Sequence, residues 1–118
     1  PHTASGLAER LHLARQRRAA LADIFGAIEA EDYERGARLC LQRFEARAPF
    51  WLYAARIGAE LLMRIERYDE AQKLYEAVIA AKTLPWAKLG VARSQLDKGE
   101  PMRAISTLEN LIGDEPRY

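Results

Sequence analysis

The residue types that most often carry out acid–base or nucleophilic chemistry are scarce in this chain of 118 residues. It has two histidines, His2 and His12, and a single cysteine, Cys40. Since His12 has no second histidine or carboxylate four residues further on, we expect a solvent-facing side chain rather than a base or a metal ligand. Cys40 falls in an apolar stripe, which favours a small buried thiol over a nucleophile. One cysteine also excludes an intrachain disulfide and a cysteine-built metal site.

One cluster of carboxylates suggests either a cation site or paired-carboxylate catalysis, and its members are Glu29, Glu31, Asp32 and Glu34. The cluster spans a predicted helix end and the next helix start, where Asp32 suits the N-cap and Glu34 suits the positive end of the helix dipole. The segment lacks the glycine of a calcium-binding loop. The sequence also contains no phosphate-binding loop and no hydrolase motif. We therefore predict no catalytic residue, no metal site, no cofactor and no enzymatic activity.

One local basic run lies near the N-terminus and consists of Arg10, Arg15, Arg17 and Arg18. Such a face can neutralise a phosphate backbone, so a nucleic-acid-binding output domain that uses residues 10–18 is one alternative function. The chain as a whole is balanced, with 18 basic and 17 acidic residues, and no aromatic residue interleaves these arginines. We therefore favour a solvated linker face over a nucleic-acid interface.

Two segments suggest a homo-oligomerisation domain as another alternative. Near the N-terminus the apolar residues have a spacing close to that of a short coiled coil: Leu7, Leu11, Ala14, Leu21, Phe25 and Ile28. The last helix, expected from Pro101 to Ile112, has more apolar residues than one inward stripe needs: Ile105, Leu108, Leu111 and Ile112. Either helix could therefore bind a second copy.

Composition and periodicity indicate a soluble all-α domain, with 49 % apolar and 30 % charged residues. The apolar spacing is helical throughout and nowhere alternates as a strand does. We expect six helices, the first unbroken over about 4–30, and helix-stopping residues mark four of the breaks between them, at 31–32, 48–49, 83–85 and 98–101. No apolar run approaches the roughly 20 residues of a membrane span, and no signal peptide is visible, so we expect a cytoplasmic protein without a membrane partner. The start at Pro1 suggests a fragment of a longer protein.

Two helix pairs look like copies of each other, and a third upstream is degenerate. The equivalent small residues Gly36, Ala71 and Ala104 lie 35 and 33 residues apart. Each stands early in the second helix of a pair, where a small side chain lets paired helices approach closely. This period resembles that of the tetratricopeptide repeat, at about 34 residues. The resemblance implies antiparallel helix pairs stacked as a right-handed solenoid of three repeats, at about 17–49, 50–83 and 84–116.

The tetratricopeptide resemblance also implies a groove lined by the first helix of each pair. In the first repeat the positions that correspond to it are Arg18, Leu21 and Phe25. In the later repeats they are Tyr53, Arg56, Glu60 and Arg64, followed by Trp86, Leu89 and Arg93. Aromatic and arginine side chains are common anchors for a bound peptide. The same residues could instead belong to the core, an alternative that carries most weight at Phe25.

The N-terminus resembles the end of a response-regulator receiver domain. The turn Pro1-His2-Thr3 leads into a helix opening at 4–11, as the last receiver helix does, although His2 replaces the usual aromatic residue. Together with segment 84–93, the chain resembles bacterial response regulators whose output region is a tetratricopeptide array. The resemblance implies that 1–16 is a receiver end and connector helix. It also implies a non-catalytic module of two-component phosphorelay signalling that binds a protein or peptide.

Overall fold

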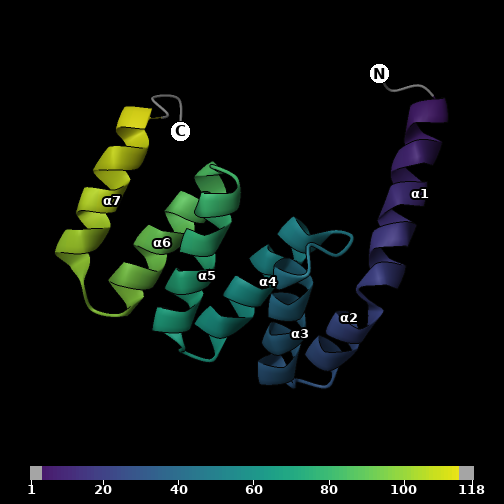
Figure 1. Cartoon of the computed structure of the whole chain (residues 1–118), viewed down its shortest axis with the longest axis horizontal. Helices are drawn as coiled ribbons and strands as arrows, with labels where there is room; N and C mark the ends of the chain where they lie inside the picture. The colour runs from purple at the N-terminus through teal and green to yellow at the C-terminus, as the bar shows by residue number, and fades with distance from the viewer. Residues whose placement is uncertain (1–3, 115–118) are drawn as a thin grey trace.

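The computed structural model describes residues 4–114 of the chain, with side chains for 4–113. Within this range the chain forms helices and no strand, so the all-α prediction is confirmed (Figure 1). The helices are α1 (Ala4–Ala20), α2 (Ala22–Glu29), α3 (Tyr33–Glu45), α4 (Trp51–Arg64), α5 (Tyr68–Ala81), α6 (Pro85–Asp97) and α7 (Pro101–Asp114). None of these helices is both long and apolar enough to cross a bilayer. Pro1, His2 and Thr3, which carry the receiver resemblance, lie outside the described residues.

The prediction of one unbroken first helix over 4–30 is wrong, because the chain bends at Leu21. Leu21 leaves the helical conformation, with φ −111° and ψ 19°, while its amide still bonds to the Arg17 carbonyl at 3.0 Å. Its side chain is fully buried in a small cluster with Ile24, Cys40 and Ala54. The bend thus separates α1, which has no buried residue, from α2, which packs on α3.

Three antiparallel helix pairs follow, α2 with α3, α4 with α5 and α6 with α7, and each pair closes with the same turn. One residue of each turn is left-handed, namely Glu31 (φ 58°), Glu66 (φ 63°) and Gly99 (φ 89°). The amide of the next residue then bonds to the carbonyl five residues back, as in a Schellman cap. These bonds are Asp32 to Ala27 at 2.8 Å, Arg67 to Leu62 at 2.9 Å and Glu100 to Gln95 at 2.8 Å. The three turn residues have the same 35- and 33-residue spacing as Gly36, Ala71 and Ala104.

Small residues lie where the helices approach most closely. Gly36, Ala71 and Ala104 are all buried. A Cβ added at Gly36 would come within 3.0 Å of Leu61 in α4. At the same interface between neighbouring pairs, a Cβ added at Gly58 of α4 would lie 2.7 Å from the Cβ of Cys40 in α3. At each of these glycines, the backbone of one helix therefore lies close to a side chain of a helix from the adjacent pair.

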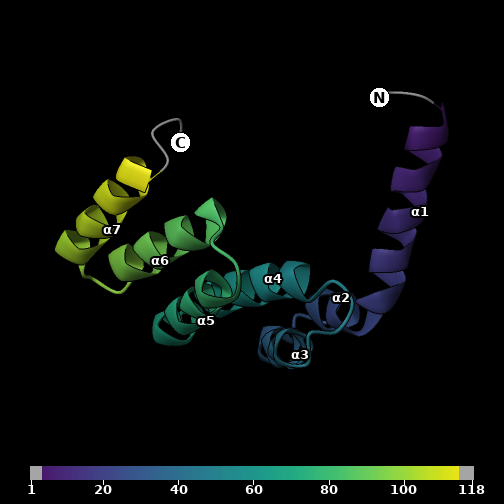
Figure 2. The ribbon, with the colours of Figure 1, turned by 45° about the horizontal axis from the view of Figure 1, so that its top comes forward.

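The pairs stand in a row, and one apolar core runs along it from α3 to α6. Helix α4 packs against α3 and α5, and α6 packs against α5 and α7. The radius of gyration is 15.9 Å, against about 13.5 Å for a compact domain of this length. Figure 2 shows the row from the side, with α1 standing off one end. In this arrangement one long face of α4 and one of α6 stay exposed to solvent.

Candidate partner-binding face

Helix α4 contributes three residues at i, i+3 and i+7, and all of them are exposed: Tyr53, Arg56 and Glu60. They are exposed because α4 turns its small residues inward, where helices on both sides pack closely against it. These buried residues are Ala54, Ala55, Gly58 and Ala59. Small buried residues on one side and large polar or aromatic ones on the other are typical of an amphipathic helix with a free face.

Helix α6 repeats this spacing with Trp86, Leu89 and Arg93. Pro85 occupies the first helical turn, where its fixed φ suits helix initiation, and this places Trp86 at the start of the face. Trp86 is half-buried, and its ring meets the edge of the Tyr75 ring at 6.3 Å between centroids. Leu89 and Arg93 are exposed.

Side chains of α4 and α6 meet in two contacts that align the helices. The guanidinium of Arg93 donates to both carboxylate oxygens of Glu60, at 2.9 and 3.2 Å. The guanidinium of Arg56 lies over the Trp86 ring, 5.1 Å from its centroid. We call this surface the α4–α6 face and define it by Tyr53, Arg56, Glu60, Trp86, Leu89 and Arg93. The structure thus brings together six residues from two helices.

Glu60 is the polar centre of the α4–α6 face. Besides the bond from Arg93, it accepts a hydrogen bond from the Tyr75 hydroxyl at 3.1 Å. Burial, followed by the negative charge of Glu60, raises the pKa of Tyr75, so its hydroxyl stays a donor at neutral pH. The hydrogen bond to Glu60 raises the pKa of Arg93 in turn. The three groups hold one another in place.

Two hollows flank Arg56. One of about 140 Å³ is lined by Trp86, Leu89 and Gly90 of α6, Tyr75 of α5, and Arg56, Glu60 and Arg93. The other, of about 400 Å³, is more open and runs along α4 past Tyr53, Arg56, Ile57, Glu60 and Leu61. Each hollow combines apolar walls with a guanidinium at its rim, which is a lining that suits a side chain of a bound peptide.

The end of α1 extends this surface. The guanidinium of Arg17 lies over the Tyr53 ring at 4.4 Å from its centroid, and that of Arg18 lies 5.9 Å from the Phe25 ring. The sequence places no aromatic residue within the basic run, but the fold brings two aromatic rings against its last two arginines. No sequence signal links Arg17 to Tyr53, because only the bend at Leu21 brings α1 beside α4.

Three other expected groove positions lie elsewhere. Arg64 is at the far end of α4, where its guanidinium lies over the Tyr33 ring at 4.6 Å. Leu21 is fully buried and belongs to the core. Phe25 is half-buried and packs against the cluster that contains Leu21. The first helix pair therefore contributes core where the second and third pairs contribute surface.

The remaining chemical candidates have structural roles. Cys40 is buried, and burial raises the pKa of its thiol to about 12, so the reactive thiolate does not form near neutral pH. His12 is exposed, as expected. Asp32 caps α3 by accepting a hydrogen bond from the Arg35 amide at 3.2 Å, which confirms the N-cap prediction. Within the part of the chain that the structure describes, no three metal-binding side chains gather.

Comparison of this chain with protein-family models, curated proteins and solved structures found no match. The geometry of the α4–α6 face is therefore the basis for inferring function.

Proposed function

We propose that this chain is a non-catalytic interaction module that holds a segment of a partner protein on the α4–α6 face. The observation that carries the proposal is the stacking of Arg56 on Trp86 between two hollows. Among residues 4–113 no ion pair joins Arg56 to a carboxylate. A guanidinium stacked on a ring keeps its N–H edge available for the carboxylates or carbonyls of a ligand.

The stacked arginines reduce the entropy that binding costs. An arginine that already lies on a ring loses less rotamer freedom when a ligand arrives. Trp, Tyr and Arg are also the residues most enriched among those that dominate binding energy. The α4–α6 face contains all three types beside hollows that fit an apolar side chain.

For the fold, we propose three tetratricopeptide-like repeats in a right-handed solenoid. The repeated left-handed turn, the small residues five positions after it and the packing of adjacent pairs all support this architecture. In such a solenoid the α4–α6 face is part of the concave surface, where extended partners bind.

For the wider context, we propose the output region of a cytoplasmic bacterial response regulator. The resemblance at residues 1–16 and 84–93 supports this, and α1, with no buried residue, suits a connector. The sequence that precedes residue 1 in the full-length protein tests it. A Lys directly before Pro1, after alternating strands and helices with an acidic pocket, is the expected result. Any other kind of domain there would contradict the assignment.

Peptide selection tests the binding face directly. Random peptides displayed on phage are selected on the immobilised full chain, and the affinities of synthetic copies are measured by fluorescence anisotropy. Leu89→Ala and Arg56→Gln should each weaken binding by about tenfold or more, as substitutions at anchor residues do.

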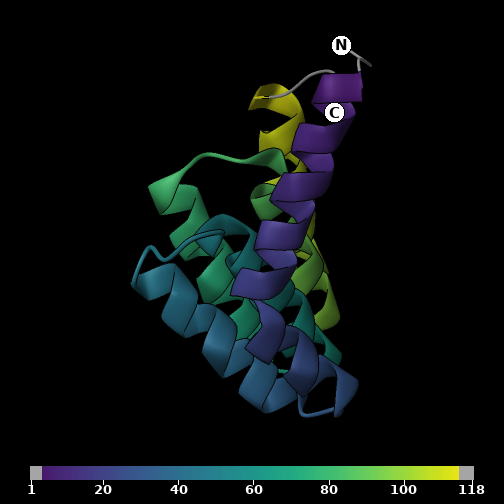
Figure 3. The same cartoon turned by 90° about the vertical axis from the view of Figure 1, so that its right-hand side faces the viewer.

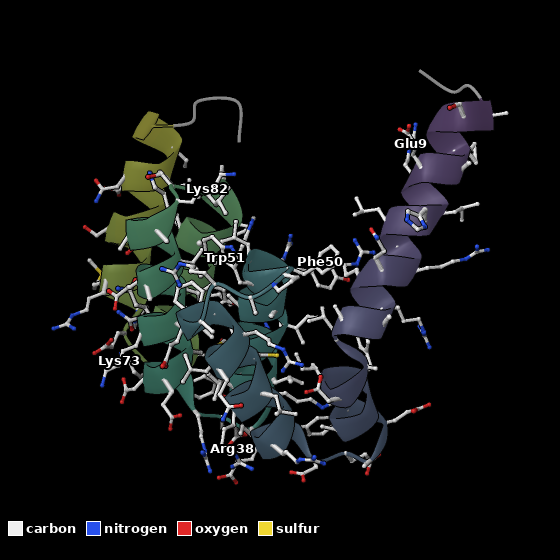
Figure 4. The ribbon with its side chains drawn as sticks, turned by 45° about the vertical axis from the view of Figure 1, so that its right-hand side comes forward. Glu9, Arg38, Phe50, Trp51, Lys73 and Lys82 are labelled. Atoms are coloured by element: carbon white, nitrogen blue, oxygen red, sulfur yellow. The ribbon has the colours of Figure 1, made fainter. Side chains whose placement is uncertain are left out.

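Each matched control changes a residue of the same type as one of the face variants, at a position outside the face. Leu96→Ala removes another exposed leucine of α6, outside the face, and Arg38→Gln removes an exposed arginine of α3, labelled at the foot of Figure 4. Both controls should leave the affinity unchanged. The proposal fails if selection yields no peptide, or if the control variants lose as much affinity as the face variants.

A second candidate is nucleic-acid binding, which the stacking of Arg17 and Arg18 on aromatic rings favours. We place it second because the guanidiniums already cover ring faces on which bases would stack. Binding of duplex or single-stranded DNA with a steep dependence on salt concentration would reverse this order.

A further inference from the structure

Helix α7 exposes apolar positions whose counterparts in the first helix pair are covered. Counting from the left-handed turn residue of each pair, position +6 is Ala37 in α3 and Ile105 in α7, and position +13 is Phe44 and Ile112. Ala37 and Phe44 are 4 % and 5 % exposed, whereas Ile105 and Ile112 are 47 % and 59 % exposed. The sequence therefore continues an apolar face on α7 for which the described chain supplies no cover.

Position +9 shows what covers this face in the other pairs. In α3 it is Cys40, which lies against Gly58 of α4, and in α5 it is Tyr75, whose ring lies against Gly90 of α6. In each case the next helix presents a glycine and packs closely. In α7 the same position is Leu108, and no described helix follows it. The missing element is a helix with small residues at the contact.

At the opposite end of the row, α2 exposes a face of that kind. Gly26 stands five residues before its turn residue, where Leu61 of α4 and Ser94 of α6 are buried. Ala22 stands nine residues before it, where Gly90 is buried. Both Ala22 and Gly26 are exposed, and a Cβ at Gly26 would meet nothing within 4 Å. Glycine inside a helix is destabilising relative to alanine, so folding of the single chain gives no reason for it.

We propose that the α7 face of one copy, formed by Ile105, Leu108 and Ile112, binds the α2 face of a second copy, formed by Ala22 and Gly26. The contact continues the α3–α4 and α5–α6 interfaces across two molecules, and both uncovered halves belong to one chain, at opposite ends of the row (Figure 1). Asp23, which stands in α2 where Gly58 stands in α4, borders the contact and is already paired with Arg43 of its own chain. The inference is independent of the function proposed above, because it uses other residues.

This association is head to tail, so each copy keeps one uncovered face and further copies can add. Light scattering and sedimentation of the full chain over a wide concentration series should therefore show a mass that rises past the dimer. Ile105→Gln with Ile112→Gln should lower the association constant at least about tenfold, as should Ala22→Gln with Gly26→Gln. Circular dichroism should show both double variants folded, since all four positions are exposed.

Mixing the two double variants gives the sharpest test. Each keeps one intact face, so an equimolar mixture should form a one-to-one dimer and nothing larger. Leu96→Gln removes another exposed apolar residue as a control and should not change association. A monomeric wild-type chain at all concentrations would show that something other than a second copy covers α7. Undiminished association of the Ala22→Gln, Gly26→Gln variant would show α7 meeting α7, and either result overturns the proposal.

Discussion

Asp23 and Arg43 form the ion pair that ties α2 to α3. One guanidinium nitrogen of Arg43 donates to both carboxylate oxygens of Asp23 at 2.8 Å, and it also lies 3.4 Å from the Ala20 carbonyl at the bend. Partial burial acts to raise the pKa of Asp23, but the hydrogen bonds from Arg43 and the Ile24 amide outweigh it, so the pKa lies below its usual value of 3.8. The ionised carboxylate is therefore the form that stabilises the fold.

Asp23→Asn should lower stability at neutral pH and have less effect in acid. Since the folded-state pKa is depressed, the contribution is present above about pH 3.8 and is lost as the pH falls through the folded value. The Asp23 side chain is 39 % exposed, so we expect only about 0.5 kcal/mol. Thermal melts of both proteins from pH 7 to pH 2 measure the difference. Glu29→Gln on the same helix is the control, and a difference that persists at the acid end would contradict this role.

The turns within the helix pairs differ in how well their residues suit a left-handed conformation. Gly99 adopts it without a Cβ, whereas Glu31 and Glu66 adopt it with one. A left-handed residue other than glycine is strained by contact between its Cβ and the backbone. The first two turns are therefore formed against a local preference, which the packing of their helices must overcome.

Substitutions at two of these turn residues should shift the free energy of unfolding in opposite directions. Glu66→Gly should stabilise the chain by up to about 1 kcal/mol, and Gly99→Ala should destabilise it by about the same amount. A Cβ at position 99 would meet nothing within 4 Å, so only the backbone conformation is changed there. Chemical denaturation of the two variants gives both values. Equal, same-sign shifts would mean that something other than the left-handed backbone dominates.

At the scale of the whole molecule, α1 stands apart from the other described helices, and the ring contacts of its side chains with them come from its last turn. It has no buried residue, and Figure 4 shows it rising away from the row, with Glu9 clear of the other helices. In Figure 3, which looks along the row, α1 lies in front of the other helices. Figure 4 also shows Phe50, which packs against the buried cluster at the bend, on the side of the row nearest α1. The anchor of α1 is therefore its junction with α2.

Amide hydrogen exchange should report this difference along the chain. Residues 4–16 should exchange at least about a hundredfold faster than the core of α4 and α5, because an isolated helix of this length is marginal in water. Measurement by mass spectrometry on the full chain, at a concentration where it is monomeric, gives the profile. Equal protection of α1 and α4 would indicate that α1 packs on something.

The sequence by itself determined the helical fold class and most helix ends. Apolar spacing predicts the helices, while Pro85, Pro101 and the cap at Asp32 mark where three of them begin, because these signals act within a few residues. The 35- and 33-residue spacing of small residues predicted the pairing of helices for the same reason: each pair is a local unit. The positions that the tetratricopeptide resemblance implied for a groove include the residues of the candidate face on α4 and α6.

Only the tertiary structure decided the bend and the contacts across helices. Leu21 carries no helix-breaking signal, and the chain bends there because its side chain is buried beside Cys40 and Ala54 from other helices. The stacking of Arg17 on Tyr53 and of Arg56 on Trp86 joins residues 36 and 30 positions apart, so no local pattern predicts it. Which apolar positions are exposed depends on neighbours in space, and for this reason only the fold shows that the faces of α2 and α7 are both uncovered.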